Sequence, residues 1–112
     1  MQIDSKKHGP LIAKLTTNGL AEFEDITGEK ITEIDFDKLS LKNMLEFVKI
    51  SINPFAKKLL TGKDIGDIVD ESAEGLVWLK KTVAGLMNEY VPQAVKDAEI
   101  PAGGENPPDA GA

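Results

Sequence analysis

Apolar residues recur at intervals of three to four in several separate stretches of the chain, which is the pattern of helices with one buried face. The first stretch predicts a helix that begins at Thr16 or Thr17, where a hydroxyl can cap the first turn, and stops at Gly28, which suits a left-handed C-terminal cap. The second stretch predicts a helix over residues 41–52, with Ser40 as its N-cap.

Two further helices are predicted in the second half of the chain. Thr61 and Asp64 have the spacing of a capping box, which predicts a helix over residues 63–71. Ser72 then precedes the longest amphipathic stretch, over residues 73–91, and is the expected cap of that helix.

The segments around these helices carry weaker patterns. Residues 29–39 place isolated apolar side chains among acids and are expected to connect two helices through a single helical turn. Pro92 either ends the last helix or starts a final turn through Ala98. Residues 99–112 are acidic and rich in Pro, Gly and Ala, which predicts disorder. Residues 1–14 alternate only weakly around a Gly-Pro turn signal, so they are either a short strand or an extended arm.

Together these elements predict an all-α fold. We expect one small bundle of about four to five helices over residues 15–98, an extended N-terminal arm and a disordered C-terminal tail. A chain of 112 residues has room for one such domain. The expected core consists of the main apolar stripes of the helices: Leu20, Phe23, Leu41, Leu45, Val48, Ile65, Ile68, Leu76, Leu79, Val83 and Leu86.

The distribution of charge narrows the possible partners. The formal net charge is −6, but the last sixteen residues hold four acids and no lysine, so residues 1–96 are nearly balanced. The chain contains no arginine, the side chain that best forms forked contacts to phosphate and guanine. We therefore expect no nucleic-acid partner. No apolar run approaches the length of a membrane span, so we also expect no membrane partner.

Residues suited to catalysis or metal binding are scarce. The chain has one histidine, His8, and no cysteine, which is too few for an ordinary zinc site or a thiolate nucleophile. Gly62-Lys63 lacks both the glycine five residues earlier and the following Ser or Thr that a phosphate loop requires. The acidic residues 64–74 are interrupted by apolar residues and do not have the spacing of a calcium loop. We expect neither enzymatic activity nor a cofactor.

The remaining candidate for a functional site is apolar surface. Phe47, Ile50 and Trp78 each lie off the main stripe of their helix. They either pack against the connector or a neighbouring helix, or stay open as a surface for a partner or for self-association. Because tryptophan is enriched among interface anchors, Trp78 is the strongest of these three candidate protein-binding residues.

The order of the helix caps, glycines and apolar positions in this chain resembles that of the tail assembly chaperones of long-tailed bacteriophages. The family pattern begins with a Thr-started helix that ends in Glu-x-x-x-Gly or Glu-x-x-Thr-Gly. A Leu-Ser-capped helix follows, then a short helix of the form Ile-Gly-x-Ile/Leu-Ile/Val-Asp, and then a long final helix. The positions that carry the match are Thr16, Leu20, Glu24, Thr27, Gly28, Leu39, Ser40, Ile65, Gly66 and Asp70. Gly19 departs from the pattern because a better helix former is expected in the first turn.

The resemblance implies a noncatalytic protein of the host bacterial cytoplasm, absent from the mature virion. Its partner would be the tape measure protein, followed by tail tube proteins that displace it. The family often makes a longer form by ribosomal frameshifting near the end of the short one. The alternative function is a small acidic phage-encoded inhibitor that mimics nucleic acid. A host module that self-associates is a third possibility.

Overall fold

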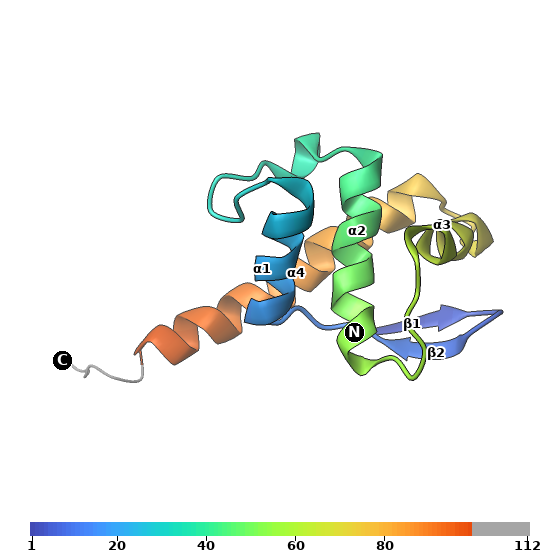
Figure 1. Ribbon diagram of the computed structural model, residues 1–112, viewed down its shortest axis with the longest axis horizontal. Coiled ribbons are helices and arrows are strands. Elements are labelled where there is room, and N and C mark those ends of the chain that lie inside the picture. The colour runs from blue at the N-terminus through green and yellow to red at the C-terminus, as the bar shows by residue number, and fades with distance from the viewer. Residues whose placement is uncertain (100–112) are drawn as a thin grey trace.

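The computed structural model describes the backbone of residues 1–99 and the side chains of residues 1–91. A β-hairpin is followed by a series of helices (Figure 1). The prediction of a small, largely helical domain is confirmed. The elements are β1 (Gln2–Ser5), β2 (Gly9–Ile12), α1 (Thr17–Thr27), the 3-10 turn η1 (Phe36–Lys38), α2 (Leu41–Ile52), the 3-10 turn η2 (Asn53–Phe55), α3 (Gly62–Glu71) and α4 (Leu76–Glu99).

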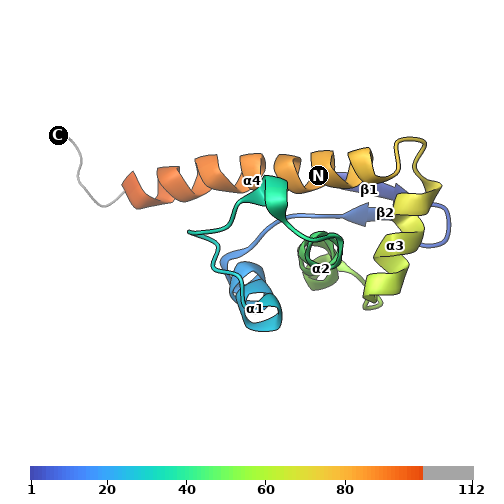
Figure 2. The ribbon, with the colours of Figure 1, turned by 90° about the horizontal axis from the view of Figure 1, so that it is seen from above.

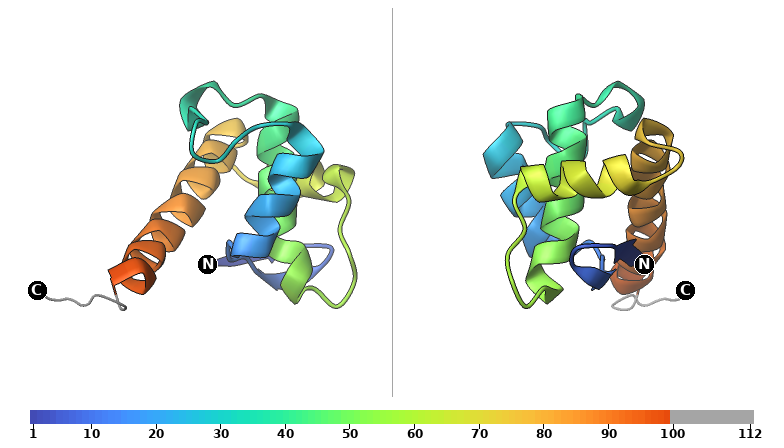
Figure 3. Two further views of the ribbon diagram at one scale, coloured as in Figure 1. Left: turned by 60° about the vertical axis from the view of Figure 1, so that its left-hand side comes forward. Right: turned by 90° about the vertical axis from the view of Figure 1, so that its right-hand side faces the viewer.

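Helix α2 lies at the centre of the domain. It contacts α1, α3 and α4, and α3 crosses it at a steep angle (Figure 3). Helix α4 runs along one side of the molecule, whereas α1, α2 and α3 lie on the other side (Figure 2). The hairpin lies beside the first half of α4 (Figure 2), and the C-terminal end of α4 extends beyond the other elements (Figure 1).

The predicted N-caps of α1, α2 and α3 are present and explain where these helices begin, whereas the prediction that Ser72 caps the last helix is wrong because α4 begins at Leu76. The hydroxyls of Thr16 and Ser40 accept hydrogen bonds from the first-turn amides of α1 and α2, at 2.9 and 3.1 Å. Thr61 and Asp64 form a complete capping box at the start of α3. Gly28 has a φ of 76°, the left-handed conformation that ends α1 at low cost.

The N-terminal residues form a strand pair, so the first of the two possibilities left open for residues 1–14 is confirmed. Gln2 pairs with Ile12 and Ser5 with Gly9 in an antiparallel register. Ile3 and Leu11, which are also paired, are both buried in the common core. The hairpin therefore belongs to the folded domain and is not a loosely attached arm.

Most of the predicted core residues are buried, but two are exposed. Leu41 and Leu76 are 48% and 56% exposed, so their assignment to the core is wrong. Each is the first residue of its helix, where the side chain lies beyond the neighbouring elements. Leu45 is half-buried and packs against the core. The remaining predicted core residues are buried: Leu20, Phe23, Val48, Ile65, Ile68, Leu79, Val83 and Leu86.

The bounds of the last helix differ from the prediction at both ends. Residues 72–75 form a turn in which the Gly75 N–H donates to the Ser72 carbonyl at 3.2 Å, so α4 begins at Leu76 and not at residue 73. The helix then continues through Pro92 to Glu99. Glu99, the first residue of the predicted disordered tail, therefore belongs to α4. Residues 100–112 lie outside the described part of the chain.

The unexpected glycine in the first turn of α1 has a packing role. A Cβ atom at Gly19 would lie 3.0 Å from the Thr16 hydroxyl and 3.3 Å from the Ile50 carbonyl oxygen of α2. Gly19 therefore lets α1 approach α2 closely. The Gly19→Ala variant should lose about 1 kcal/mol of stability to crowding, despite the better helix propensity of alanine.

Gly66 provides the matched control for that measurement. It lies inside α3, and a Cβ there would meet nothing within 4 Å. Gly66→Ala should therefore gain about 0.5–1 kcal/mol. Urea denaturation of both variants checks the pair, and a Gly19→Ala protein as stable as Gly66→Ala would show that α1 and α2 are not in close contact.

The capping box also makes the stability of α3 depend on pH. The hydrogen bond that the Thr61 backbone N–H donates to the Asp64 carboxylate, 2.8 Å long, is the main cause that lowers the Asp64 pKa below its ordinary value of 3.8. A group whose pKa is lowered in the folded state stabilises the fold fully when the pH is above its ordinary pKa. This stabilisation is lost as the pH falls through the pKa of the folded state.

Comparison of the wild type with the Asp64→Asn variant tests this linkage. We expect the wild type to be the more stable near neutral pH. The difference should be smaller at an acidic pH below 3.8, because the stabilisation is lost as the pH falls through the lowered pKa of Asp64. Urea midpoints at the two pH values measure it. A difference that stays constant with pH would mean that the charge on Asp64 does not contribute.

Candidate protein-binding surface

Two of the three predicted binding residues belong to the core. Phe47 is 0% exposed and packs edge-on against Phe23, with ring centroids 5.2 Å apart, and against Phe36, at 5.4 Å. Ile50 is 3% exposed and lies against Gly19 of α1. Neither side chain can reach a partner of the folded domain, so both are removed from the candidate site.

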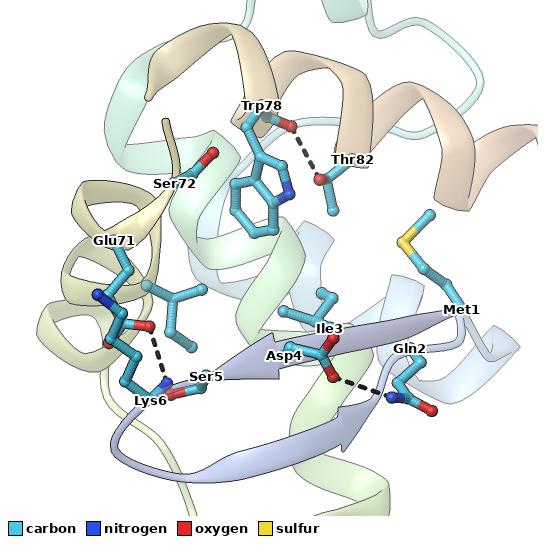
Figure 4. A pocket seen from close by; sticks show the side chains of 11 residues that line it. Met1, Gln2, Ile3, Asp4, Ser5, Lys6, Glu71, Ser72, Trp78 and Thr82 are labelled. Carbon is cyan, nitrogen blue, oxygen red and sulfur yellow. Dashed lines mark hydrogen bonds between the residues drawn. The ribbon is translucent and has the colours of Figure 1, made fainter. Parts of the chain in front are cut away.

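Trp78 occupies a different environment. It lies half-buried near the start of α4, one helical turn before Thr82, and its indole projects toward β1 (Figure 4). A groove of about 540 Å³ opens between these elements. We call it the Trp78 groove, and its lining consists of Met1, Gln2, Ile3, Asp4, Ser5, Lys6, Ile68, Glu71, Ser72, Trp78 and Thr82.

The hairpin is attached to the helices at both ends of the Trp78 groove. At one end, the Met1 side chain packs against Gly85 so closely that a Cβ atom at Gly85 would lie only 2.8 Å from the Met1 Cε atom. The Met1 amino nitrogen also lies 3.4 Å from Glu89 Oε1. At the other end, the Lys6 N–H donates to Glu71 Oε1 at 2.9 Å. The sequence indicated that this face of α4 is distinct but not that a strand partly covers it.

A second apolar hollow, of about 400 Å³, lies at the opposite edge of the hairpin. We call it the Phe55 hollow. Its lining consists of His8, Pro10, Leu11, Ile12, Ile52, Phe55, Ala56, Lys57, Lys58 and Leu60. Ile12, Phe55 and the adjacent Leu59, which is 72% exposed, give it an open apolar rim. This surface could not be predicted from the sequence, because a short apolar segment between two helices has no periodicity that would show which of its sides is exposed.

The loop beside the Phe55 hollow is held by one side chain. The Asn53 amide donates to the Leu60 carbonyl at 3.0 Å and accepts from the Leu60 N–H at 2.9 Å. With these two hydrogen bonds in place, the Leu60 side chain is buried in the core and the Leu59 side chain is exposed. The loop therefore presents its apolar and lysine side chains from a fixed backbone.

The acidic and histidine side chains serve mainly structural contacts. His8 Nε2 lies 3.8 Å from Asp64 Oδ1, and Glu74 pairs with Lys81 at 3.2 Å on the surface. Within residues whose side chains are described, no group of three or more His, Asp or Glu is arranged to hold a metal ion. No helix of the described chain is long and apolar enough to cross a membrane.

The structure defines residues 1–99 as a small, largely helical domain whose surface includes the Trp78 groove and the Phe55 hollow. No protein-family model, curated protein or solved structure matches the chain.

Proposed function

We propose that the protein is a noncatalytic tail assembly chaperone that binds the tape measure protein of a long-tailed bacteriophage before the tail tube assembles around it. The Trp78 groove carries this proposal. It presents a half-buried aromatic side chain beside an incompletely covered strand, which is a suitable anchor point for another polypeptide.

The residues behind the family resemblance support the choice of partner. Thr16, Ser40 and Gly28 cap helices, and Ile65 is fully buried. Positions that fix the beginnings, ends and packing of helices would be shared by chains with the same helical layout. The likeness therefore concerns the layout of the domain, and the partner is inferred from it.

The physical task fits a small domain with open apolar recesses. A very long protein with exposed apolar stripes aggregates unless those stripes are covered. Covering by many small domains, each bound weakly, also allows tube subunits to displace them. We infer that the protein acts in the host bacterial cytoplasm, is absent from the mature virion and can contact neighbouring copies of itself along the tape measure protein.

Co-expression tests the proposal. The tape measure protein encoded in the same phage genome should be insoluble when expressed alone and soluble when this chain is co-expressed. A variant with Trp78→Ala provides the matched control and should rescue less of it. Equal insolubility with and without the wild-type chain would overturn the proposal.

The longer form that the family often makes is tested at the level of the gene. A slippery nucleotide run in the codons for residues 100–112 should be followed by an open reading frame in a shifted phase. Absence of such a run would remove the frameshifted form from the proposal and leave the short form as the chaperone.

A further inference from the structure

The outer edge of β1 presents backbone groups that the hairpin itself does not use. Met1 and Ala13 exchange both of their backbone hydrogen bonds, at 2.8 and 3.0 Å. Hydrogen-bonded and non-hydrogen-bonded pairs alternate along an antiparallel ladder. Since Gln2 pairs with Ile12 and Asp4 with Pro10, the N–H and C=O groups of Gln2 and Asp4 point away from β2.

The backbone groups at the two outer edges of the hairpin have different hydrogen-bond partners. On the β2 side, the Lys14 N–H donates to the Ser51 carbonyl at the end of α2, at 2.9 Å. On the β1 side, Glu71 accepts the Lys6 N–H, as a neighbouring strand would. Among the described residues, no acceptor is bonded to the N–H groups of Gln2 and Asp4, and both residues line the Trp78 groove.

The groove has the form of a site for one added strand. The open edge of β1 forms one side, and Trp78 and Thr82 of α4 form the other (Figure 4). A neighbouring strand lies about 4.8 Å from the edge that it joins, and a groove of about 540 Å³ lies in the usual range for a ligand site. We propose that the Trp78 groove binds an extended segment of a partner protein as a third strand beside β1.

The backbone chemistry of the groove favours this occupant over a helix or a second copy of the domain. A helix satisfies its own backbone groups along its length and has none to offer to Gln2 and Asp4. In a folded second copy, the matching edge of β1 faces that copy's own α4 across the same groove, so it is recessed and does not project into a neighbour. An extended segment of about four residues matches the length of β1.

The side chains around the groove define which segment fits. Ile3 and Ser5 face the core, whereas Gln2 and Asp4 face solvent. An added strand would alternate in the same way, with its inward side chain over Trp78 and its outward side chains beside Asp4. The lining includes two carboxylates, Asp4 and Glu71, against the side-chain cation of Lys6 and the Met1 amino group. Glu89, which lies outside the lining, already pairs with the Met1 amino group at 3.4 Å. The predicted segment therefore has an apolar inward residue flanked by lysine or arginine.

This inference rests on the proposed function for the identity of the partner, but it can be tested without it. A library of random ten-residue peptides displayed on filamentous phage is selected against the full chain. The matched comparison is the Asp4→Pro variant, which removes one outward N–H and places a ring in the groove. Its hairpin should persist because that N–H does not bond β2, and Pro10, its cross-strand partner, is already a proline.

We expect peptides with alternating apolar and basic residues to bind the wild type and to bind Asp4→Pro about tenfold more weakly. Asp4→Asn, which keeps the N–H, should stay within about threefold of the wild type. Hydrogen exchange on the wild-type complex gives a second readout, in which the amides of Gln2 and Asp4 should become protected. No enrichment above the Asp4→Pro background, or binding without this protection, would overturn strand addition.

The outcomes separate this inference from the proposed function. If selected peptides protect Gln2 and Asp4 but the tape measure protein does not bind, strand addition stands and the chaperone proposal fails. If the tape measure protein binds wild type and Asp4→Pro equally, the chaperone proposal stands and strand addition fails.

Discussion

Replacing Phe47 with alanine is expected to lower the free energy of unfolding by about 3–5 kcal/mol. The ring is fully buried between α1, η1 and α2, where it packs edge-on against Phe23 and Phe36. The substitution loses the transfer free energy of the ring and leaves a cavity that the surrounding helices fill only in part. Because domains of this kind have only about 5–15 kcal/mol in total, the variant should unfold at a much lower urea concentration.

The control for this prediction lies on the same helix. Leu41 is exposed at the first position of α2, so Leu41→Ala should cost less than about 1 kcal/mol. Far-UV circular dichroism during urea titration measures both variants. A loss below about 1 kcal/mol for Phe47→Ala would contradict its burial and return Phe47 to the candidate binding residues.

The second large effect is expected at Trp78. Trp78→Ala should weaken binding of the purified tape measure protein by about thirtyfold or more, which is the size of effect that defines an interface anchor. The reason is that the indole forms most of the apolar wall of the Trp78 groove on the α4 side. Because the side chain is half-buried, the affinity must be calculated per folded molecule, with the folded fraction taken from urea titration.

Val77 provides the matched control for Trp78. It is the preceding residue of α4, is 55% exposed and does not line the groove. Val77→Ala should therefore leave the affinity within about twofold of the wild type. Equal affinities for Trp78→Ala and Val77→Ala would show that the partner does not contact the groove.

The helix ends could be predicted from the sequence because they depend on neighbouring residues only. The hydroxyls of Thr16, Ser40 and Thr61 each accept from the amide three residues later, which requires no contact with the rest of the chain. The same holds for Gly28, whose left-handed conformation ends α1 locally. The start of α4 escaped prediction because Ser72 and Gly75 close a separate turn before the helix.

The buried side of α2 could not be predicted from its own sequence. The periodicity favoured a single stripe that included Leu41 and left out Phe47 and Ile50. In the structure α2 is the central helix and contacts α1, α3 and α4, so most sides of its C-terminal half are buried. Which sides of a helix are covered depends on how many neighbours surround it, and that is a property of the whole fold.

The candidate site was predictable only in part. Trp78 and Thr82 lie on the same side of α4, and the sequence distinguished that side from the main stripe. The groove itself depends on where the hairpin lies, and a hairpin of two short strands has too little local pattern to define its position. The open edge of β1 follows from the pairing register, which the sequence left undetermined.

Affinity capture from cells that produce the parent phage tests the central claim most directly. The full chain should carry its affinity tag after Ala112, because a tag before Met1 would lie next to the Trp78 groove. Mass spectrometry of the captured proteins should find the tape measure protein with the wild type and much less of it with Trp78→Ala. Capture of a host nuclease or polymerase in place of the tape measure protein would contradict the chaperone function and favour an inhibitor.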